Sequence, residues 1–348
     1  MIAAGGTAGH VVPALSVADA LQAEGADVVF IGGERAEQTL VPRRGYELHS
    51  IRVLPLPRRR PWGALRAALT DAGAVGAASR LLRQLGADAV LGAGGYVAAP
   101  VGLAAVARRL PLVLMEADSH VGLANRMLAP FAHRVFLAFP IVGREGKHYR
   151  VAGRPVPQPA TDRGAARSRF GIEADETCVL VFGGSQGARS INLAAVEAFA
   201  GATFRVLHAA GDRDLPDLRA PNPFYDLRGF ISEFGDALLA SDLVVARAGG
   251  SVFEIAAHGR PAVLIPYPYA TADHQMANAR YLERAGAAVV ITDSELTPAR
   301  LASEVGRLLA DQPRLREMAR ASASLARPQA AREIAQEVLA AVEKRNRG

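Results

Sequence analysis

Cysteine is almost absent from this sequence of 348 residues, which contains only Cys178. One thiol cannot form an internal disulfide, and it cannot supply a cluster of thiolate ligands for a metal. Uninterrupted apolar runs of about 20 residues, the length of a membrane-spanning helix, are also missing, as is the pattern of a signal peptide. We therefore expect a protein of the cytoplasm without redox chemistry.

Aromatic residues are few as well, at 6% of the chain. Proteins that bind single-stranded nucleic acid interleave stacking aromatics with basic residues. This pattern is missing here, so we expect no nucleic-acid partner in spite of a net charge of +6. The positive charge gathers instead between residues 43 and 83, which hold nine arginines, two acidic residues and the only tryptophan, Trp62.

Apolar runs do alternate with helical patterns along the chain. Buried strands are predicted at ADVVFIGG, DAVLGAGG, LPLVLMEA and HRVFLAF, with helices over 64–85 and 98–108 between them. After a Pro- and Gly-rich stretch, 151–164, the pattern starts again with TCVLVFGG, FRVLHAAG, YDLRGF, DLVVARAGG, PAVLIPYP and AAVVIT. Strands that alternate with helices in this way form parallel sheets.

The length of 348 residues, half of them apolar, suits two domains with separate cores. The predicted fold class is α/β, with two doubly wound Rossmann-like domains facing across a cleft. We place the first domain at 1–153 and the second at 154–328. A final helix, about 329–348, is expected to pack back on the first domain.

Four glycine-rich turns stand where strands give way to helices: GGTAGH (5–10), GAGGYVAAP (92–100), GGSQGARSIN (183–192) and RAGGSVFE (247–254). Ligands bind at this edge of an open α/β sheet. Glycine lets backbone amides approach an oxyanion, and the following helix N-terminus adds partial positive charge. None of the turns is a P-loop or a complete dinucleotide fingerprint. We therefore predict a phosphate-bearing ligand of another kind.

These turns, together with RAGGSVFEIAAHGRPAVLIPYPYATADHQMANARYLERAGAA (247–288), resemble the MurG glycosyltransferases of bacterial cell-wall synthesis, over nearly the whole chain. The resemblance implies a GT-B fold and inverting transfer of N-acetylglucosamine from UDP-GlcNAc to the C4 hydroxyl of the muramoyl sugar of lipid I, giving lipid II. It implies no cofactor. It also implies a peripheral enzyme on the cytoplasmic face of the inner membrane, with cell-wall synthesis or division proteins as further candidate partners.

The resemblance assigns ligand contacts to individual residues. Glu254 would accept the ribose hydroxyls, although a carboxylate at a helix start is also favoured by the macrodipole alone. The backbone of Ile231 would read uracil beside Phe230. The implied donor-binding set is Thr7, Ala8, Gly9, Asp118, Arg154, Ser185, Gln186, Phe230, Ile231, Gly249, Gly250, Ser251, Glu254, Gln275 and Asn278. The implied acceptor-binding set is Gly6, Gly94, Gly95 and Tyr96.

A base must take the proton of the acceptor hydroxyl, and the ordinary pKa of histidine, about 6.5, suits that role. We expect His10 to be this base, with Glu116 and Asp118 as rivals. A histidine that only bonds a neighbouring carbonyl or a phosphate is the alternative. The pair Asp212-x-Asp214 has a spacing that holds a metal in another glycosyltransferase fold, but we interpret it as a solvated turn and expect no metal.

Four positions depart from the family pattern. Ala8 replaces a glycine of the first loop, which the turn tolerates only with a negative φ. Asp118 replaces an amide that contacts ligand, and Arg154 stands where the family commonly has asparagine. The turn 247–254 is one residue shorter than the family loop.

The segment LPLPRRRPWGALRAAL (54–69) is predicted to contact an anionic membrane surface through Arg58, Arg59, Arg60 and Trp62. The alternative is a solvated loop with a buried Trp62. For the chain as a whole, the alternative enzyme is a sugar-nucleotide epimerase of the same fold, in which we would expect more acidic catalytic residues.

Overall fold

The computed structural model describes residues 1–53, 61–184, 186–270 and 273–347, with the backbone alone over 61–72. The chain divides into two compact units, here named unit 1 (Met1–Pro157 and Arg327–Gly348) and unit 2 (Gln158–Ala326). The sequence predicts the first boundary at 153/154, whereas the units divide at 157/158. The difference arises because Arg154 is built into unit 1, where its Nη1 donates to the Ala117 carbonyl at 3.0 Å.

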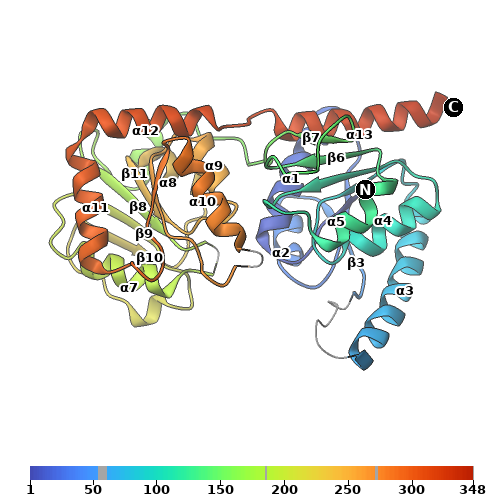
Figure 1. The fold of residues 1–348 in the computed structure, drawn as a ribbon, viewed down its shortest axis with the longest axis horizontal. Coiled ribbons are helices and arrows are strands. Elements are labelled where there is room, and N and C mark those ends of the chain that lie inside the picture. Colours follow the sequence, from blue (N-terminus) through green and yellow to red (C-terminus); the bar gives the residue numbers. More distant parts are fainter. Residues whose placement is uncertain (54–60, 185, 271–272, 348) are drawn as a thin grey trace. The chain divides into compact units, whose positions relative to one another are not determined.

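Unit 1 contains a seven-stranded parallel sheet in the order β3-β2-β1-β4-β5-β6-β7 (Figure 1). The short strand β1 lies between β2 and β4, where Ile2 pairs with both Phe30 and Leu91. The strand order therefore runs outward in both directions from the β1–β4 pair. The elements of unit 1 are β1 (Ile2–Ala3), α1 (Ala8–Ala23), β2 (Val29–Gly32), α2 (Glu37–Arg43), β3 (Glu47–Ser50), α3 (Pro61–Gln84), β4 (Val90–Gly92), α4 (Ala98–Ala107), β5 (Leu112–Glu116), α5 (Leu123–Leu128), the 3₁₀ turn η1 (Ala129–Phe131), β6 (Arg134–Leu137), β7 (Tyr149–Val151) and α13 (Ala330–Arg347).

Each face of this sheet has its own apolar core. Adjacent strand residues point to opposite faces, so in β5 the side chain of Met115 joins one core and that of Leu114 joins the other. The first core is closed by α1, α2 and α13, and the second by α3, α4 and α5. The last helix, α13, lies along α1 (Figure 1) and contributes the buried residues Ile334 and Val338 to the first core.

Unit 2 contains a six-stranded parallel sheet in the order β10-β9-β8-β11-β12-β13. Its central pair is β8–β11, in which Leu180 pairs with Val244. The elements of unit 2 are α6 (Arg163–Arg169), β8 (Cys178–Phe182), α7 (Arg189–Ala198), β9 (Arg205–Ala209), the 3₁₀ turn η2 (Leu215–Asp217), β10 (Tyr225–Arg228), α8 (Phe234–Ala240), β11 (Leu243–Ala246), α9 (Val252–Ala257), β12 (Ala262–Leu264), α10 (His274–Arg284), β13 (Ala288–Val290), α11 (Pro298–Ala310) and α12 (Gln312–Ser324).

The same alternation builds the core of unit 2. Val181 packs with α7, α11 and α12 on one face of the sheet. Its neighbour Phe182 points to the other face and meets Phe234 of α8 edge to face, with ring centroids 4.9 Å apart. Unit 2 is therefore covered by helices on both faces, as a parallel sheet requires.

Every apolar run predicted as a strand forms one in the structure. The edge strands β3 and β7 were not predicted, because ELHS and YRV lack a continuous apolar run and are partly exposed. Among the described residues, no helix is both long and apolar enough to cross a membrane.

Candidate functional site

The four glycine turns follow β1, β4, β8 and β11, the two central strands of each sheet. At a central pair the strand order reverses, so neighbouring loops diverge and leave room for a ligand. The sequence predicts these turns at strand ends. The topology adds that the two turns of each unit follow the two neighbouring strands at which the strand order reverses. Each unit thus has one candidate ligand-binding edge.

In unit 1 the first glycine turn and the turn after β4 meet at His10. A Cβ on Gly94, which has a φ of +88°, would lie 2.7 Å from Cδ2 of the His10 ring. Only glycine therefore fits under the imidazole. Ala8 begins helix α1, and the positive φ in its turn falls on Gly6, at +110°. The departure from the family pattern at Ala8 is thus accommodated without backbone strain.

A buried carboxylate, Glu37, fixes the first turn from one side. Its Oε2 accepts the Gly6 N–H at 2.9 Å, and its Oε1 accepts the amides of Gly33 at 2.9 Å and Arg35 at 3.2 Å. The Tyr96 hydroxyl approaches Oε1 at 3.4 Å. Sequence reasoning missed Glu37, although a carboxylate placed soon after the Gly-Gly end of a strand is a usable signal. Gly6 is predicted to contact the acceptor, but its amide already donates to Glu37.

The opposite side of this turn is held by a buried cation. Arg154 donates from Nη2 to the Gly9 carbonyl and from Nη1 to the Ala117 carbonyl. Its side chain lies in unit 1, and these two bonds give it a role in joining the first turn to the loop after β5. A contact of Arg154 with the donor remains a prediction.

Glu116, the first rival of His10, is only 4% exposed. Its carboxylate accepts the Asp118 amide, the Gly122 amide at 2.8 Å and the Asn125 side chain at 3.0 Å. Burial raises the pKa of Glu116 above its ordinary value, and these three donors act against that shift. Because its oxygens already hold the loop that leads to α5, Glu116 is less suited than His10 to take a proton from a ligand.

In unit 2 the turn after β11 leads into α9, and Glu254 lies in the first turn of that helix, as the sequence predicts. Helix α10 supports the turn: the buried Asn278 donates to the Ala248 carbonyl at 3.0 Å. Gln275 accepts the Tyr267 amide at 3.0 Å through Oε1, and its Nε2 lies 3.9 Å from where a Cβ on Gly249 would be. The structure therefore brings the predicted residues of α9 and α10 to one edge.

A second missed residue, Arg247, ties together three segments of this edge. Its guanidinium donates to the Ile265 and Pro266 carbonyls, to Asp293 at 2.6 Å and to the Ser190 hydroxyl at 2.8 Å. Arg247 is 8% exposed and immediately precedes the glycine turn. An arginine at the buried end of a central strand, just before Ala-Gly-Gly, is the signal that would have found it.

The two members of the Asp212-x-Asp214 pair differ: Asp212 is exposed, whereas Asp214 is part of a buried network. Asp214 accepts from Asn192 at 2.9 Å, and the Asn192 Oδ1 is 3.0 Å from His208 Nε2. His208 Nδ1 is 2.7 Å from the Tyr225 hydroxyl. Burial lowers the pKa of His208 to about 4. Among the described residues, no group of three or more metal-binding side chains is positioned to hold an ion.

The remaining predicted residues divide by accessibility. Phe230 is 63% exposed, while Ile231 is buried, consistent with a surface ring beside a backbone contact. Gln186 is exposed in the turn after β8. Ser185, Arg58, Arg59 and Arg60 lie outside the described residues, and Trp62 falls in α3 where only the backbone is described.

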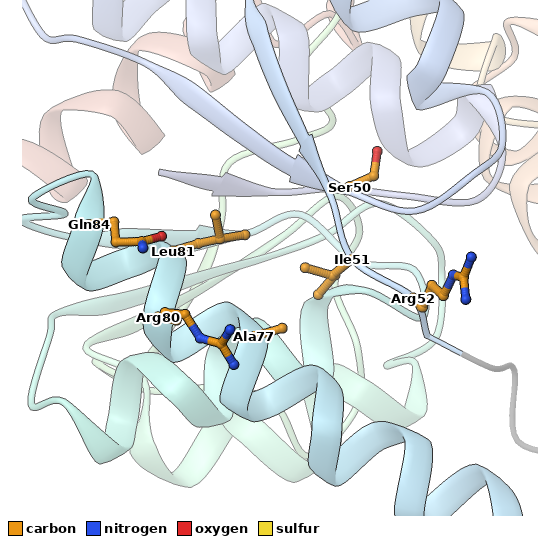
Figure 2. A pocket seen from close by; sticks show the side chains of 7 residues that line it. All are labelled: Ser50, Ile51, Arg52, Ala77, Arg80, Leu81 and Gln84. Atoms are coloured by element: carbon orange, nitrogen blue, oxygen red, sulfur yellow. The ribbon is translucent and has the colours of Figure 1, made fainter.

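A pocket of about 380 Å³ lies away from the glycine turns, between the end of β3 and helix α3 (Figure 2). Its floor is apolar, formed by Ile51, Ala77 and Leu81, and two arginines, Arg52 and Arg80, flank it. Its lining residues from the end of β3 precede the basic segment 54–69 in the chain, and those from α3 follow it.

Comparisons with known proteins cover nearly the whole chain. The glycosyltransferase family 28 N-terminal domain matches residues 1–137, and the glycosyltransferase family 28 C-terminal domain matches residues 178–337. The UDP-N-acetylglucosamine--N-acetylmuramyl-(pentapeptide) pyrophosphoryl-undecaprenol N-acetylglucosamine transferase of Halothermothrix orenii is 36% identical over 93% of this chain and 94% of its own length. The transferase of the same name from Rubrobacter xylanophilus is 40% identical over 93% and 98%.

Solved structures agree. The crystal structure of Acinetobacter baumannii MurG matches with a TM-score of 0.76 at 30% identity, covering 98% of both chains. A UDP-GlcNAc 2-epimerase from Neisseria meningitidis matches with a TM-score of 0.68 but at 13% identity, which shows a shared fold alone.

The two units therefore correspond to the two domains of one GT-B glycosyltransferase. The protein is a member of glycosyltransferase family 28. Within that family, identities of 36% and more over almost the full length place it in the MurG family of N-acetylglucosaminyltransferases.

Proposed function

We propose that the protein transfers N-acetylglucosamine from UDP-GlcNAc to the C4 hydroxyl of the muramoyl sugar of lipid I, giving lipid II in peptidoglycan synthesis. The observation that carries this proposal is the identity to transferases of that name over nearly the full length of both chains. In the reaction, the acceptor oxygen bonds to C1 of the sugar while the bond from C1 to the UDP oxygen breaks. The acceptor proton goes to a base.

The donor is assigned to unit 2. The amides of Gly249, Gly250 and Ser251 precede α9, where the helix dipole favours the diphosphate. Glu254 accepts the ribose hydroxyls, and the Gln275 amide, oriented by the Tyr267 N–H, donates to the sugar. Uracil lies at Phe230 and Ile231, next to the turn that contains Gly229.

His10 is assigned as the base. Its ring is fixed over Gly94 at the ligand-binding edge of unit 1, whereas the carboxylate of Glu116 is occupied by three donors. Histidine is the side chain that most often serves as a general base. The amides of Thr7 and Ala8, at the start of α1, are assigned to phosphate oxygens, because the N–H groups at a helix N-terminus favour anions.

We also assign a membrane contact to unit 1, because the acceptor carries a polyprenyl chain. The predicted segment, with Arg58, Arg59, Arg60 and Trp62, leads into α3, which packs with α4, and α4 packs with α5. Leu123 and Met127 of α5, and Phe131 of the 3₁₀ turn that follows it, are exposed. Exposed apolar side chains in the unit that carries the arginine-rich segment suit an anionic bilayer surface.

The transfer is tested with labelled UDP-GlcNAc and a short-chain lipid I analogue. We expect label in the acceptor, with release of UDP. Conversion of UDP-GlcNAc to its 2-epimer without transfer would instead support the epimerase. The control omits the acceptor, in which case label should remain in UDP-GlcNAc.

The membrane contact is tested by co-sedimentation with liposomes that contain or lack anionic phospholipid. An Arg58/Arg59/Arg60→Ser variant should lose binding to anionic liposomes, and Arg314→Ser, on helix α12 of unit 2, is the matched control. Equal binding by wild type and the triple variant would place the contact elsewhere.

A further inference from the structure

Gly6, in the first turn of unit 1, is fixed through both of its backbone polar groups. Its N–H donates to Glu37 at 2.9 Å, and its carbonyl accepts the Ala36 amide at 3.3 Å. The Gly6 amide therefore cannot also bind an oxyanion. Glu37 moreover adds a fully buried negative charge directly behind the turn. An anionic ligand at this edge needs a compensating cation.

One arginine is held beside that turn. The guanidinium carbon of Arg35 lies 5.4 Å from the centroid of the Tyr96 ring, in cation–π contact. The same ring lies 3.8 Å from where a Cβ on Gly6 would be, and its hydroxyl covers Gly33. The Arg35 backbone is anchored by its N–H to Glu37. Backbone and side chain of Arg35 are thus both positioned by residues that also contact Gly6 or its neighbours.

The charge of Arg35 remains available to a ligand. Arg35 is exposed, and within the described part of the chain it forms no ion pair. The buried Arg154, by contrast, holds the Gly9 and Ala117 carbonyls. Of these two cations at the first turn, Arg35 is the one that faces solvent.

We propose that Arg35 binds the diphosphate of the acceptor, with Tyr96 as the residue that positions its guanidinium. This proposal rests on the proposed function, because lipid I supplies the diphosphate. A planar guanidinium donates two parallel N–H bonds to a phosphate group, which a lysine ammonium cannot reproduce. Tyr96 thereby gains a role beyond lining the acceptor site: its ring carries the cation and its hydroxyl bonds the carboxylate that holds Gly6.

The test is steady-state kinetics of the full-length protein with UDP-GlcNAc and a short-chain lipid I analogue. Arg35→Ala should raise KM for the acceptor about 10- to 100-fold, the loss expected for charge-assisted hydrogen bonds, and leave KM for UDP-GlcNAc unchanged. Arg35→Lys should give an intermediate KM. Arg43→Ala, which removes an exposed arginine from the far end of α2, should behave as wild type.

A second measurement separates this proposal from the proposed function. Inhibition by a short prenyl diphosphate, or its equilibrium binding if the wild type transfers no sugar, should weaken about 10-fold or more in Arg35→Ala. Wild-type protein without transfer activity would refute the proposed function. Unchanged affinity for the prenyl diphosphate in Arg35→Ala, or an equal loss in Arg43→Ala, would overturn the assignment of Arg35.

Discussion

The two units differ in the buried charges beside their glycine turns: unit 1 has a carboxylate, Glu37, in addition to the cation Arg154, whereas unit 2 has the cation Arg247. In unit 1, Glu37 accepts backbone N–H groups from Gly6 and Gly33. In unit 2, Arg247 donates to backbone carbonyls of Ile265 and Pro266. A carboxylate accepts hydrogen bonds from backbone amides, so those amides cannot bind a ligand. A guanidinium donates to carbonyls and does not engage the amides.

The consequence appears in the turns themselves. In the described part of unit 2, no amide of Gly249, Gly250 or Ser251 donates a hydrogen bond within the protein. These three donors precede a helix, so we expect unit 2 to bind the proposed diphosphate through its backbone. Unit 1 has lost one such donor at Gly6, and we therefore expect it to depend on side chains for the same task.

The largest effect should come from the catalytic role assigned to unit 1. His10→Ala should lower kcat about 10²- to 10⁴-fold, the usual contribution of a general base, with UDP affinity unchanged because the uracil and ribose contacts are assigned to Phe230, Ile231 and Glu254 of unit 2. Steady-state kinetics and calorimetry with UDP measure the two quantities. Near-normal turnover in His10→Ala, together with loss of turnover in Glu116→Gln, would move the base to Glu116.

Replacement of the buried charges Glu37 and Arg247 by neutral side chains tests the comparison between the two units directly. Glu37→Gln should raise KM for the acceptor and spare UDP affinity, whereas Arg247→Gln should weaken UDP binding and spare the acceptor. Each variant should lose about 3 kcal/mol of binding free energy for its own ligand, because a buried hydrogen-bonding partner of the replaced charge is left unpaired. The matched control is Glu304→Gln, a buried carboxylate of α11 that pairs with Arg307. Loss of UDP affinity by the same factor in both variants would show that the anchors act on overall stability alone.

Glu254→Ala sharpens the assignment of the donor to unit 2. UDP and UDP-GlcNAc should both bind about 10- to 100-fold more weakly, since hydrogen bonds to a charged carboxylate contribute about 1.5–3 kcal/mol. Calorimetry with each ligand measures this. Glu197→Ala, which removes an exposed carboxylate from α7, should bind as wild type, and unchanged UDP affinity in Glu254→Ala would contradict a ribose contact.

The smallest effect concerns pH and again separates the units. The folded pKa of His208, about 4, lies below its ordinary value of 6.5. Its neutral form therefore stabilises unit 2 fully above pH 6.5, and this stabilisation is lost as the pH falls toward 4. Linkage gives a loss of about 2 kcal/mol between pH 7 and pH 5.

Hydrogen exchange of β9 and β10 peptides, corrected for intrinsic rates, measures this loss. His208→Gln should show a flatter pH dependence than wild type. The peptides of α1 and α13 in unit 1 provide the reference, and an equal acid response in both units would assign the loss to other groups.

The central strands and the glycine turns were predictable from sequence because both have local signatures. Strands buried on both faces read as apolar runs, and Gly6 and Gly94 occupy positive φ values that favour glycine. The family resemblance then directed attention to residues such as Glu254. The edge strands β3 and β7 escaped because pairing on one side only does not demand a full apolar run.

The anchoring charges could not be predicted, because their partners are distant in sequence. Glu37 meets Gly6 across 31 positions, and Arg247 meets Ser190 across 57. Every residue other than proline has the same backbone N–H and C=O groups, so the sequence does not show which of them pair with a side chain. The ligand contact of Arg154 stays a prediction, but its bonds to the Gly9 and Ala117 carbonyls of its own unit could not be predicted from the sequence.

The placement of α13 in unit 1 has a consequence for synthesis on the ribosome. Unit 2 is one continuous stretch, 158–326, whereas unit 1 joins 1–157 to the last segment of the chain. Chains emerge at about 5–20 residues per second, and continuous domains fold as they appear. Unit 2 can thus complete its core before unit 1, although its residues are made later than most of unit 1. Until Ile334 and Val338 leave the exit tunnel, the part of this core that α13 covers stays exposed, and we expect chaperones to bind the nascent unit 1 during that interval.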